Sequence, residues 1–209
     1  MKIKVCGMRD KENIESLIAL KPDFMGFIFY DKSKRFVTDF PKVKIPSIIK
    51  KVGVFVNETI EEVISIAEKY QLDCIQLHGD ELPEYCEKLS QSKFDLESHQ
   101  IDIFKAFSID ENFDFNTTKQ YENCCNYFLF DTKGNDYGGN GIKFNWEILQ
   151  KYKGNIPFLL SGGISAKDVN EIKKINHPQF MGVDVNSGFE IKPALKDIEK
   201  LKEFKSNLL

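Results

Sequence analysis

The sequence lacks the motifs and the long apolar segments that mark several large protein classes. Its five cysteines are odd in number and none has CxxC spacing, so neither a disulfide framework nor a zinc site is expected. The phosphate-binding patterns GxGxxG and GxxxxGKS/T are both missing. No apolar run reaches 18 residues, and the start, Met1–Lys4, lacks the apolar core of a signal peptide, so no membrane segment is expected.

Charge and cysteine content narrow the choice of partners and compartment. A net charge of −3 and a pI near 5.7 argue against a general nucleic-acid-binding surface, so any anionic ligand has to be met by local donors. Cysteines outside a disulfide framework fit a reducing cytoplasm. The adjacent pair Cys124 and Cys125 precedes an apolar run and is interpreted as packing. We expect neither a metal nor an organic cofactor, and no membrane or nucleic-acid partner.

Short apolar runs rich in Val, Ile and Phe recur along the chain. Continuous runs of this kind are typical of strands that are buried on both faces of a parallel sheet. There are eight: Ile3–Cys6, Phe24–Phe29, Val52–Val56, Cys74–Leu77, Ile101–Phe107, Tyr127–Asp131, Pro157–Ser161 and Met181–Val185.

Segments with helical spacing lie between most of these runs. "TIEEVISIAEKY" predicts a helix capped by Thr59, and "SAKDVNEIKKI" predicts one capped by Ser165. "PALKDIEKLKEF" predicts a last helix that starts at Pro193 and turns Leu195, Ile198, Leu201 and Phe204 inward. "TDFPKVKIPSIIK" has two prolines and poor periodicity, so the second helix is expected to be short or absent. The segment 91–100 reads as a polar connector.

Eight strands alternating with helices favour an α/β fold, a compact single-domain (β/α)8 TIM barrel spanning 1–209. An open doubly wound sheet is the competing fold, and the missing dinucleotide fingerprint counts against it. In a barrel, every loop that follows a strand opens on one face, where active sites lie. Chemically useful residues are therefore expected at the carboxyl ends of the strands.

Three of the first four runs end near such residues. Cys6 follows the first run, and a thiol there is either a packed hydrophobe or, with its pKa lowered by nearby cations, a base or nucleophile. Arg35 in "YDKSKRFV" offers a fork of donors for a carboxylate, unless it is a solvated surface charge. His78 in "QLHGDE" could titrate near neutrality, with Gln76 or Asp80 as support, although a lone histidine is more often structural.

The last three runs add an acid and two glycine turns. Asp131 ends a run that should be buried, so it must find donors or take up a proton, and a protonated carboxyl is what a general acid needs. Gly162-Gly163 and Ser187-Gly188 follow the seventh and eighth runs, where barrels commonly bind phosphate. The glycine-rich segment 138–141 is expected to form a mobile or ligand-contacting loop. Together these residues fit a proton-shuttling isomerase of a phosphorylated sugar.

The order of motifs resembles one family, the phosphoribosylanthranilate isomerases of tryptophan biosynthesis. The resemblance covers nearly the whole chain and is carried by "KVCGMRD", "GFIFYDKSKRFV", "VGVFVN", "CIQLHGDE", "FDTKGNDYGGNGIKFNW", "LLSGGIS" and "GVDVNSGFE" followed by "KD". It implies a (β/α)8 barrel that performs an Amadori rearrangement. The substrate would be N-(5'-phosphoribosyl)anthranilate and the product 1-(o-carboxyphenylamino)-1-deoxyribulose 5-phosphate.

The resemblance also implies duties for particular residues. Cys6 is similar to the family's general base, Asp131 to its general acid and Arg35 to the arginine that holds the anthranilate carboxylate. The backbones of Gly162, Gly163, Ser187 and Gly188 resemble the phosphate cradle, and His78 and Asp184 match positions near the ligand. A monomer is expected, with a homodimer as the alternative. The sequence departs from the family at Lys34, where a proline is common, and in its poorly periodic second helical segment.

Rival functions remain open on the residues alone. A metal-dependent epimerase would need several His and acidic ligands at strand ends, and only His78 is available. A relative of indole-glycerol-phosphate synthase would need lysine and glutamate acid–base groups, for which Lys105 is the tempting residue. A non-enzymatic barrel that binds a phosphorylated ligand or senses thiols would bind without turnover.

Overall fold

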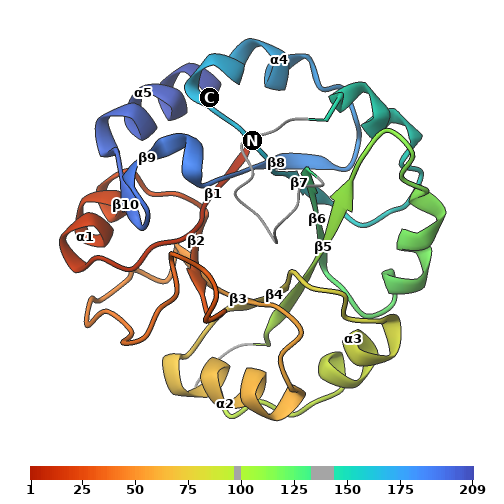
Figure 1. The fold of residues 1–209 in the computed structure, drawn as a ribbon, viewed down its shortest axis with the longest axis horizontal. Helices are drawn as coiled ribbons and strands as arrows, with labels where there is room; N and C mark the ends of the chain where they lie inside the picture. Colours follow the sequence, from red (N-terminus) through yellow and green to blue (C-terminus); the bar gives the residue numbers. More distant parts are fainter. Residues whose placement is uncertain (97–99, 133–143) are drawn as a thin grey trace.

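The computed structural model describes residues 1–96, 100–132 and 144–209, and in it the chain forms a closed barrel of eight parallel strands (Figure 1). Each strand pairs with its neighbours in chain order, and β1 pairs with β8 to close the ring. The predicted (β/α)8 fold is therefore confirmed. The strands are β1 (Lys2–Val5), β2 (Phe24–Ile28), β3 (Lys50–Phe55), β4 (Cys74–Leu77), β5 (Asp102–Ile109), β6 (Tyr127–Thr132), β7 (Phe158–Leu160) and β8 (Phe180–Val185).

Helices surround the ring of strands (Figure 1). The α-helices are α1 (Lys11–Ala19), α2 (Ile60–Tyr70), α3 (Pro83–Ser90), α4 (Val169–Lys174) and α5 (Ile198–Leu208). Four 3-10 helices complete the layer: η1 (Phe115–Tyr121), η2 (Trp146–Lys151), η3 (Ala166–Asp168) and η4 (Ser187–Phe189). No helix among the described residues is long and apolar enough to cross a membrane.

The segment between β2 and β3 contains no helix, as its two prolines and poor periodicity predict. A proline in a helix interior removes a backbone donor and clashes with the preceding turn. Instead of a helix, Phe40 covers this side of the barrel, stacking on Tyr70 of α2 with ring centroids 4.5 Å apart. The expected connector 91–100 has neither helix nor strand in the part that the structure describes.

The two predicted N-caps are confirmed. The Thr59 side chain accepts a hydrogen bond from the backbone N–H of Glu62 and starts α2. Ser165 forms a capping box with Asp168, whose carboxylate accepts from the Ser165 backbone at 2.7 Å. The segment after Ser165 begins as the 3-10 helix η3 and continues as α4, in which Ile172 is fully buried.

The predicted start of the last helix at Pro193 is wrong. Residues 190–196 form a small antiparallel hairpin, β9 (Glu190–Lys192) with β10 (Leu195–Lys196), and α5 begins after its N-cap Asp197. The extended backbone of Lys196 is bonded on both sides by Asn13 of α1, whose amide accepts from the Lys196 N–H and donates to its carbonyl. This tertiary contact outweighs the local helical pattern.

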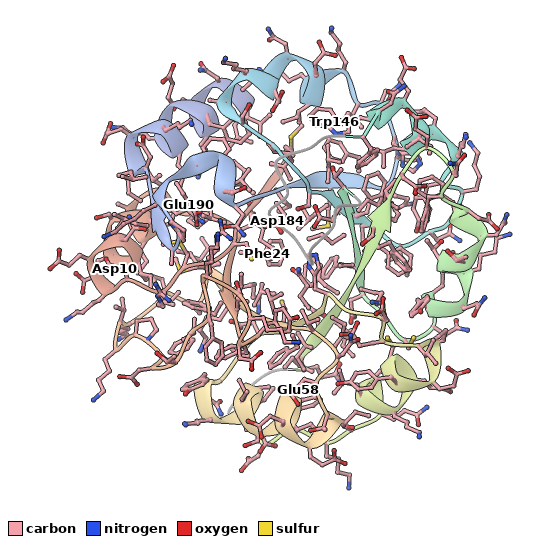
Figure 2. The ribbon with its side chains drawn as sticks, viewed as in Figure 1. Asp10, Phe24, Glu58, Trp146, Asp184 and Glu190 are labelled. Atoms are coloured by element: carbon pink, nitrogen blue, oxygen red, sulfur yellow. The ribbon has the colours of Figure 1, made fainter. Side chains whose placement is uncertain are left out.

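An apolar layer closes one end of the barrel interior. Phe24 of β2 meets Phe104 of β5 edge-to-face at 5.5 Å, and Phe24 lies near the centre of the ring in Figure 2. The layer forms its own cluster, made of Phe24, Val52, Cys74, Phe104, Ala106, Leu129 and Leu159. Because side chains alternate along a strand, Lys4 and Cys6 at the end of β1 point to the same side as each other, toward the interior. The interior is thus packed, and the carboxyl ends of the strands are left to form a site.

Candidate active site

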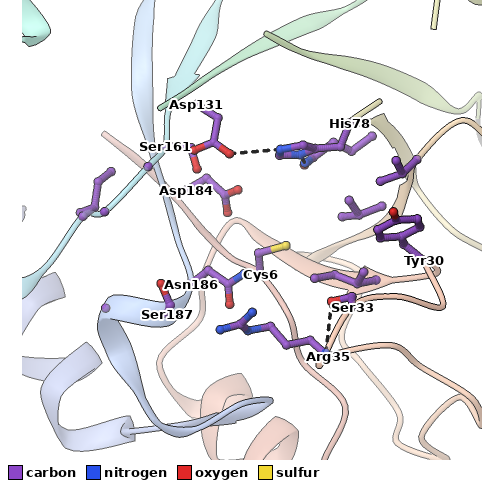
Figure 3. A pocket seen from close by; sticks show the side chains of 18 residues that line it. Cys6, Tyr30, Ser33, Arg35, His78, Asp131, Ser161, Asp184, Asn186 and Ser187 are labelled. Atoms are coloured by element: carbon purple, nitrogen blue, oxygen red, sulfur yellow. Dashed lines mark hydrogen bonds and ion pairs between the residues drawn. The ribbon is translucent and has the colours of Figure 1, made fainter. Parts of the chain in front are cut away.

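A pocket opens at the carboxyl ends of the strands and encloses about 700 Å³, including its open mouth (Figure 3). Its walls contain all nine residues that the sequence singled out as catalytic, substrate-binding or phosphate-binding. They are Cys6, Arg35, His78, Asp131, Gly162, Gly163, Asp184, Ser187 and Gly188. Residues as far as 182 positions apart in the chain, Cys6 and Gly188, therefore meet at one site. The segment 138–141, expected as a ligand-contacting loop, lies outside the described residues.

Cys6 follows β1 and is only 4% exposed. Burial raises the pKa of its thiol, because a thiolate loses hydration in the protein interior. The ammonium groups of Lys4 and Lys196 lower this pKa, and the carboxylate of Asp184 raises it, so the net shift is upward. The thiol is thus buried near two cations, and burial outweighs their effect on its pKa.

Lys4 and Asp184 form a buried ion pair next to the thiol. The Lys4 ammonium donates to Asp184 Oδ2 at 2.9 Å, and both side chains are at most 5% exposed. Burial raises the pKa of Asp184, although Lys4 opposes the rise. The other carboxylate oxygen, Oδ1, has no hydrogen-bond partner in the structure. Since buried acceptors are nearly always paired, Oδ1 is suited to accept a hydrogen bond from a ligand.

Asp131 has a donor at each oxygen. The backbone N–H of Thr132 donates to Oδ1 at 2.9 Å, and His78 Nε2 lies 3.1 Å from Oδ2, across the pocket wall (Figure 3). Gln76, on β4, meets the other ring nitrogen of His78 at 2.7 Å. This chain of side chains fixes the direction in which the Asp131 carboxyl faces. The predicted support of His78 by Gln76 is confirmed.

The two glycine turns pack against their neighbours so closely that a side chain would not fit. Gly162 has a φ of +91°, and a Cβ there would lie 2.1 Å from Thr132 Oγ1. A Cβ on Gly188 would lie 2.1 Å from the carbonyl oxygen of Ile164, in the turn after β7. The turns after β7 and β8 are therefore in contact, and their backbones form one wall of the pocket. Backbone N–H groups at such a wall can approach an oxyanion closely.

Arg35 is held by a partner that the sequence did not reveal. Its Nε and Nη2 donate to the two oxygens of Glu190 in β9 at 2.9 and 2.7 Å. Lys196 of β10 donates to the same carboxylate at 2.6 Å. Burial opposes ionisation of Glu190, but the hydrogen bonds from Arg35 and Lys196 hold its pKa below the ordinary value. The run "SGFE" followed by "KD" contained the signal, because both Glu190 and Lys196 stand in this short charged segment after the eighth strand.

Lys105, the residue that a synthase would use, is engaged elsewhere. Its ammonium donates to the Glu81 carboxylate and to the carbonyl of Gly79, each at 2.8 Å, and the side chain is 4% exposed. Glu81 also accepts from the backbone N–H groups of Asn57 and Gly79. The pair therefore ties together the loops after β3 and β4. Neither residue lines the pocket.

Three thiols lie together outside the pocket. The sulfurs of Cys86, Cys124 and Cys125 are within 4.8 Å of one another, the one group of possible metal ligands found among the described residues. Structural zinc takes four ligands, and this group offers three. The Cys124 thiol donates to the carbonyl oxygen of Tyr121 at 3.4 Å and all three cysteines are buried, so packing accounts for the cluster.

Comparison with known proteins gives one consistent result. The family model described as N-(5'phosphoribosyl)anthranilate (PRA) isomerase matches residues 3–207. The isomerase of that name from Parabacteroides distasonis is 49% identical, with 100% of this chain and 94% of the relative covered. The isomerase from Phocaeicola vulgatus is 44% identical and covers 100% of this chain and 98% of its own length.

Solved structures agree with the sequence relatives. The crystal structure of phosphoribosyl anthranilate isomerase from Thermotoga maritima has a TM-score of 0.82 at 31% identity and covers 100% of this chain and 98% of its own. A structure of the isomerase in complex with reduced 1-(o-carboxyphenylamino)-1-deoxyribulose 5-phosphate has a TM-score of 0.79 at 30% identity, with the same coverage. The match of family model, relatives and fold over nearly every residue leaves one conclusion: this chain belongs to the N-(5'-phosphoribosyl)anthranilate isomerase family.

Proposed function

We propose that this chain catalyses the Amadori rearrangement of N-(5'-phosphoribosyl)anthranilate to 1-(o-carboxyphenylamino)-1-deoxyribulose 5-phosphate, a step of L-tryptophan biosynthesis. The observation that carries the proposal is that Cys6 and Asp131, from β1 and β6, line one pocket between an arginine and two glycine turns. An aldose–ketose isomerisation of this substrate needs an acid, a base, a carboxylate site and a phosphate site. The pocket has a residue or a turn suited to each.

Asp131 opens the sugar ring in this mechanism. In its protonated form it donates to the ribose ring oxygen, the bond from that oxygen to C1 breaks, and an iminium ion forms between C1 and the anthranilate nitrogen. The 3.1 Å contact with His78 suits both protonation states of Asp131. A carboxylate accepts a hydrogen bond from the Nε2–H of the ring, whereas a carboxylic acid donates a hydrogen bond to the unprotonated Nε2 of the other tautomer.

Cys6 acts next, as the base. The iminium ion acidifies the proton on C2, the Cys6 thiolate removes it, and the resulting enolamine tautomerises to the ketone. Each proton transfer by a positioned side chain contributes about 10²–10⁴-fold to the rate. Lys4, beside the thiol, favours the thiolate at the moment when it is needed.

Binding groups hold both ends of the substrate. The phosphate lies against the backbone of Gly162, Gly163, Ser187 and Gly188, and the anthranilate carboxylate binds Arg35. The unpartnered Oδ1 of Asp184 accepts a hydrogen bond from a hydroxyl of the sugar. Binding energy at the two ends can then be used at the reacting carbons between them.

Two measurements test the proposal together. The purified chain should convert N-(5'-phosphoribosyl)anthranilate, generated in situ, to the ketose, as followed by chromatography. The gene should also restore growth without tryptophan to a host that lacks only this isomerase. A chain that binds the ketose but produces none of it would instead be a phosphorylated-ligand-binding barrel.

The compartment and the assembly state belong to the same proposal. We propose a monomer in the cytoplasm, where the five free cysteines stay reduced. The large exposed apolar residues are far apart in the sequence, among them Ile48, Leu82 and Ile191. A structure from Thermotoga maritima is described as monomers generated from a dimeric phosphoribosylanthranilate isomerase. Sedimentation equilibrium at micromolar concentration separates the two states, and a mass near 48 kDa, twice the 24.1 kDa of one chain, would contradict the monomer.

A further inference from the structure

Lys196 is a buried cation that stands behind the pocket without lining it. Its ammonium is 0% exposed and donates to Glu190 Oε1 at 2.6 Å and to Asn186 Oδ1 at 2.7 Å. Glu190 in turn is bonded to Arg35, which does line the pocket, as does Asn186. Lys196 therefore contacts Asn186, which lines the pocket, and Glu190, which holds the arginine of the proposed carboxylate site.

The way in which Glu190 holds Arg35 leaves one edge of the guanidinium for a ligand. Glu190 takes the side of the group formed by Nε and Nη2. The end formed by Nη1 and the second proton of Nη2 is not used in this contact. A guanidinium binds a carboxylate through two parallel N–H···O bonds at either edge. Among the described residues no hydrogen bond uses this end, so it is a second fork, fixed in direction by the first.

The charges of the group favour one added anion. Arg35 and Lys196 are cations and Glu190 is an anion, so the three together carry one positive charge. A substrate carboxylate at the free end of Arg35 would neutralise the group. Without the cation of Lys196, the charges of Arg35 and Glu190 would already cancel, and an incoming carboxylate would meet the field of Glu190 with no surplus positive charge.

We propose that Lys196 is a positioning and specificity-determining residue: it offsets the charge of Glu190, so that Glu190 can orient Arg35 while the site still attracts the substrate's carboxylate. The inference rests on the proposed function, because it assumes that the ligand of Arg35 is a carboxylate on the aromatic ring.

The backbone around Lys196 is built to keep its ammonium in place. Asn13 of α1 accepts from the Lys196 N–H at 2.7 Å and donates to its carbonyl at 2.9 Å, and Asn13 is itself 7% exposed. On the pocket side, Gly7 has a φ of +77°, and a Cβ there would lie 2.7 Å from Arg35 Cδ and 2.8 Å from Asn186 Oδ1. The glycine after Cys6 therefore lets Arg35 and Asn186 pack against the backbone at this turn.

Ligand binding with and without the carboxylate tests the inference. The probes are reduced 1-(o-carboxyphenylamino)-1-deoxyribulose 5-phosphate and its analogue that lacks the ring carboxyl, each titrated by calorimetry. For Lys196→Met, we expect the carboxylated probe to bind about 30-fold or more weaker, and the analogue to bind within about threefold of the wild type. Arg35→Ala measures how much affinity is lost when the contact with the probe's carboxylate is removed. Lys205→Met is the control, since Lys205 also donates from its ammonium, to the carbonyl oxygens of Leu20 and Lys21, but lies on α5 and does not line the pocket.

The double variant Glu190→Gln with Lys196→Met keeps the inference testable if the single variant folds poorly. It has the same net charge as the wild type and leaves no unpaired carboxylate. We expect it to bind the carboxylated probe no more than about sixfold weaker than the wild type does, against about 30-fold or more for Lys196→Met, and the remaining loss reflects an amide that orients Arg35 less well than a carboxylate. In steady state, Lys196→Met should raise KM by a larger factor than it lowers kcat.

The outcomes separate this inference from the proposed function. If Lys196→Met weakens both probes equally, or if the double variant binds no better than the single one, Lys196 has only a structural role and the inference fails. If the wild type binds neither probe and forms no ketose, the proposed function itself fails.

Discussion

Lys4 and Cys6 lie two residues apart at the end of β1, so that the ammonium of Lys4 is beside the thiol and donates at 2.9 Å to Asp184. One strand thus supplies both the proposed base and a cation that favours its ionised form. Burial opposes ionisation of the thiol and Lys4 supports it, and this balance underlies the predictions that concern Cys6.

Cys6→Ala should lower kcat/KM by about 10²–10⁴-fold, because the proton on C2 loses its base. Steady-state rates with substrate generated in situ measure the effect. Cys74→Ala is the matched control: Cys74 is also a buried cysteine on a barrel strand, but it belongs to the apolar layer and not to the pocket wall. A Cys6→Ala protein that turns over at more than a tenth of the wild-type rate would show that another group removes the proton.

Asp131→Asn should also lower kcat/KM by about 10²–10⁴-fold, because an amide cannot deliver a proton to the ring oxygen. The substitution preserves size and can still accept from Thr132 N–H, so the protein should remain folded. The control measurement is binding of the reduced product, which should change much less than turnover. Equal losses in binding and turnover would assign Asp131 to substrate binding instead of proton transfer.

The pH profile of kcat/KM should fall through the alkaline range. The reactive form needs one proton on the pair, because Asp131 must be protonated while Cys6 is a thiolate, and the pair loses that proton at high pH. Since burial raises the pKa of Cys6, the midpoint of the fall should lie above the ordinary thiol value of about 8.5. The same shift affects stability. The folded protein keeps the Cys6 proton at a pH where the unfolded chain has lost it, so the stability that wild type has over Cys6→Ala should fall as pH rises above about 8.5. A profile that is flat from pH 7 to 10 would contradict the assignment of Cys6 as the base.

Lys105→Met should destabilise the fold by about 3 kcal/mol, because it leaves the carboxylate of Glu81 buried without its cation. Urea unfolding followed by circular dichroism measures the change. The double variant with Glu81→Gln should recover much of the loss, since a neutral amide oxygen can still accept from Asn57 and Gly79. If the single and double variants are equally unstable, packing of the Lys105 chain and not its charge accounts for the effect.

The residues that line the pocket could be predicted from the sequence, whereas the residues that hold them in place could not. Cys6, Asp131 and the glycine turns were identified because each follows an apolar run, and strand ends of one barrel share a face. The roles of Glu190 and Lys196 were missed, although both residues stand in the motif "GVDVNSGFE" followed by "KD". Periodicity along a sequence does not reveal which charged residues will form ion pairs. The start of the last helix was wrong for a similar reason. Pro193 is a good first residue of a helix, but the bonds from Asn13 keep Lys196 extended.

The sequence by itself determined the eight strands and which residues stand at their ends, because burial on both faces imposes continuous apolar runs that can be read locally. Only the tertiary structure decided the partners: Arg35 with Glu190 across 155 positions, Lys4 with Asp184 across 180, and Asn13 with Lys196 across 183. All three pairs form because the barrel closes, which brings the first strands of the chain against the last. The pattern of apolar residues along the chain indicates how deeply each residue is buried. A contact between the two ends of the chain depends instead on how the barrel closes.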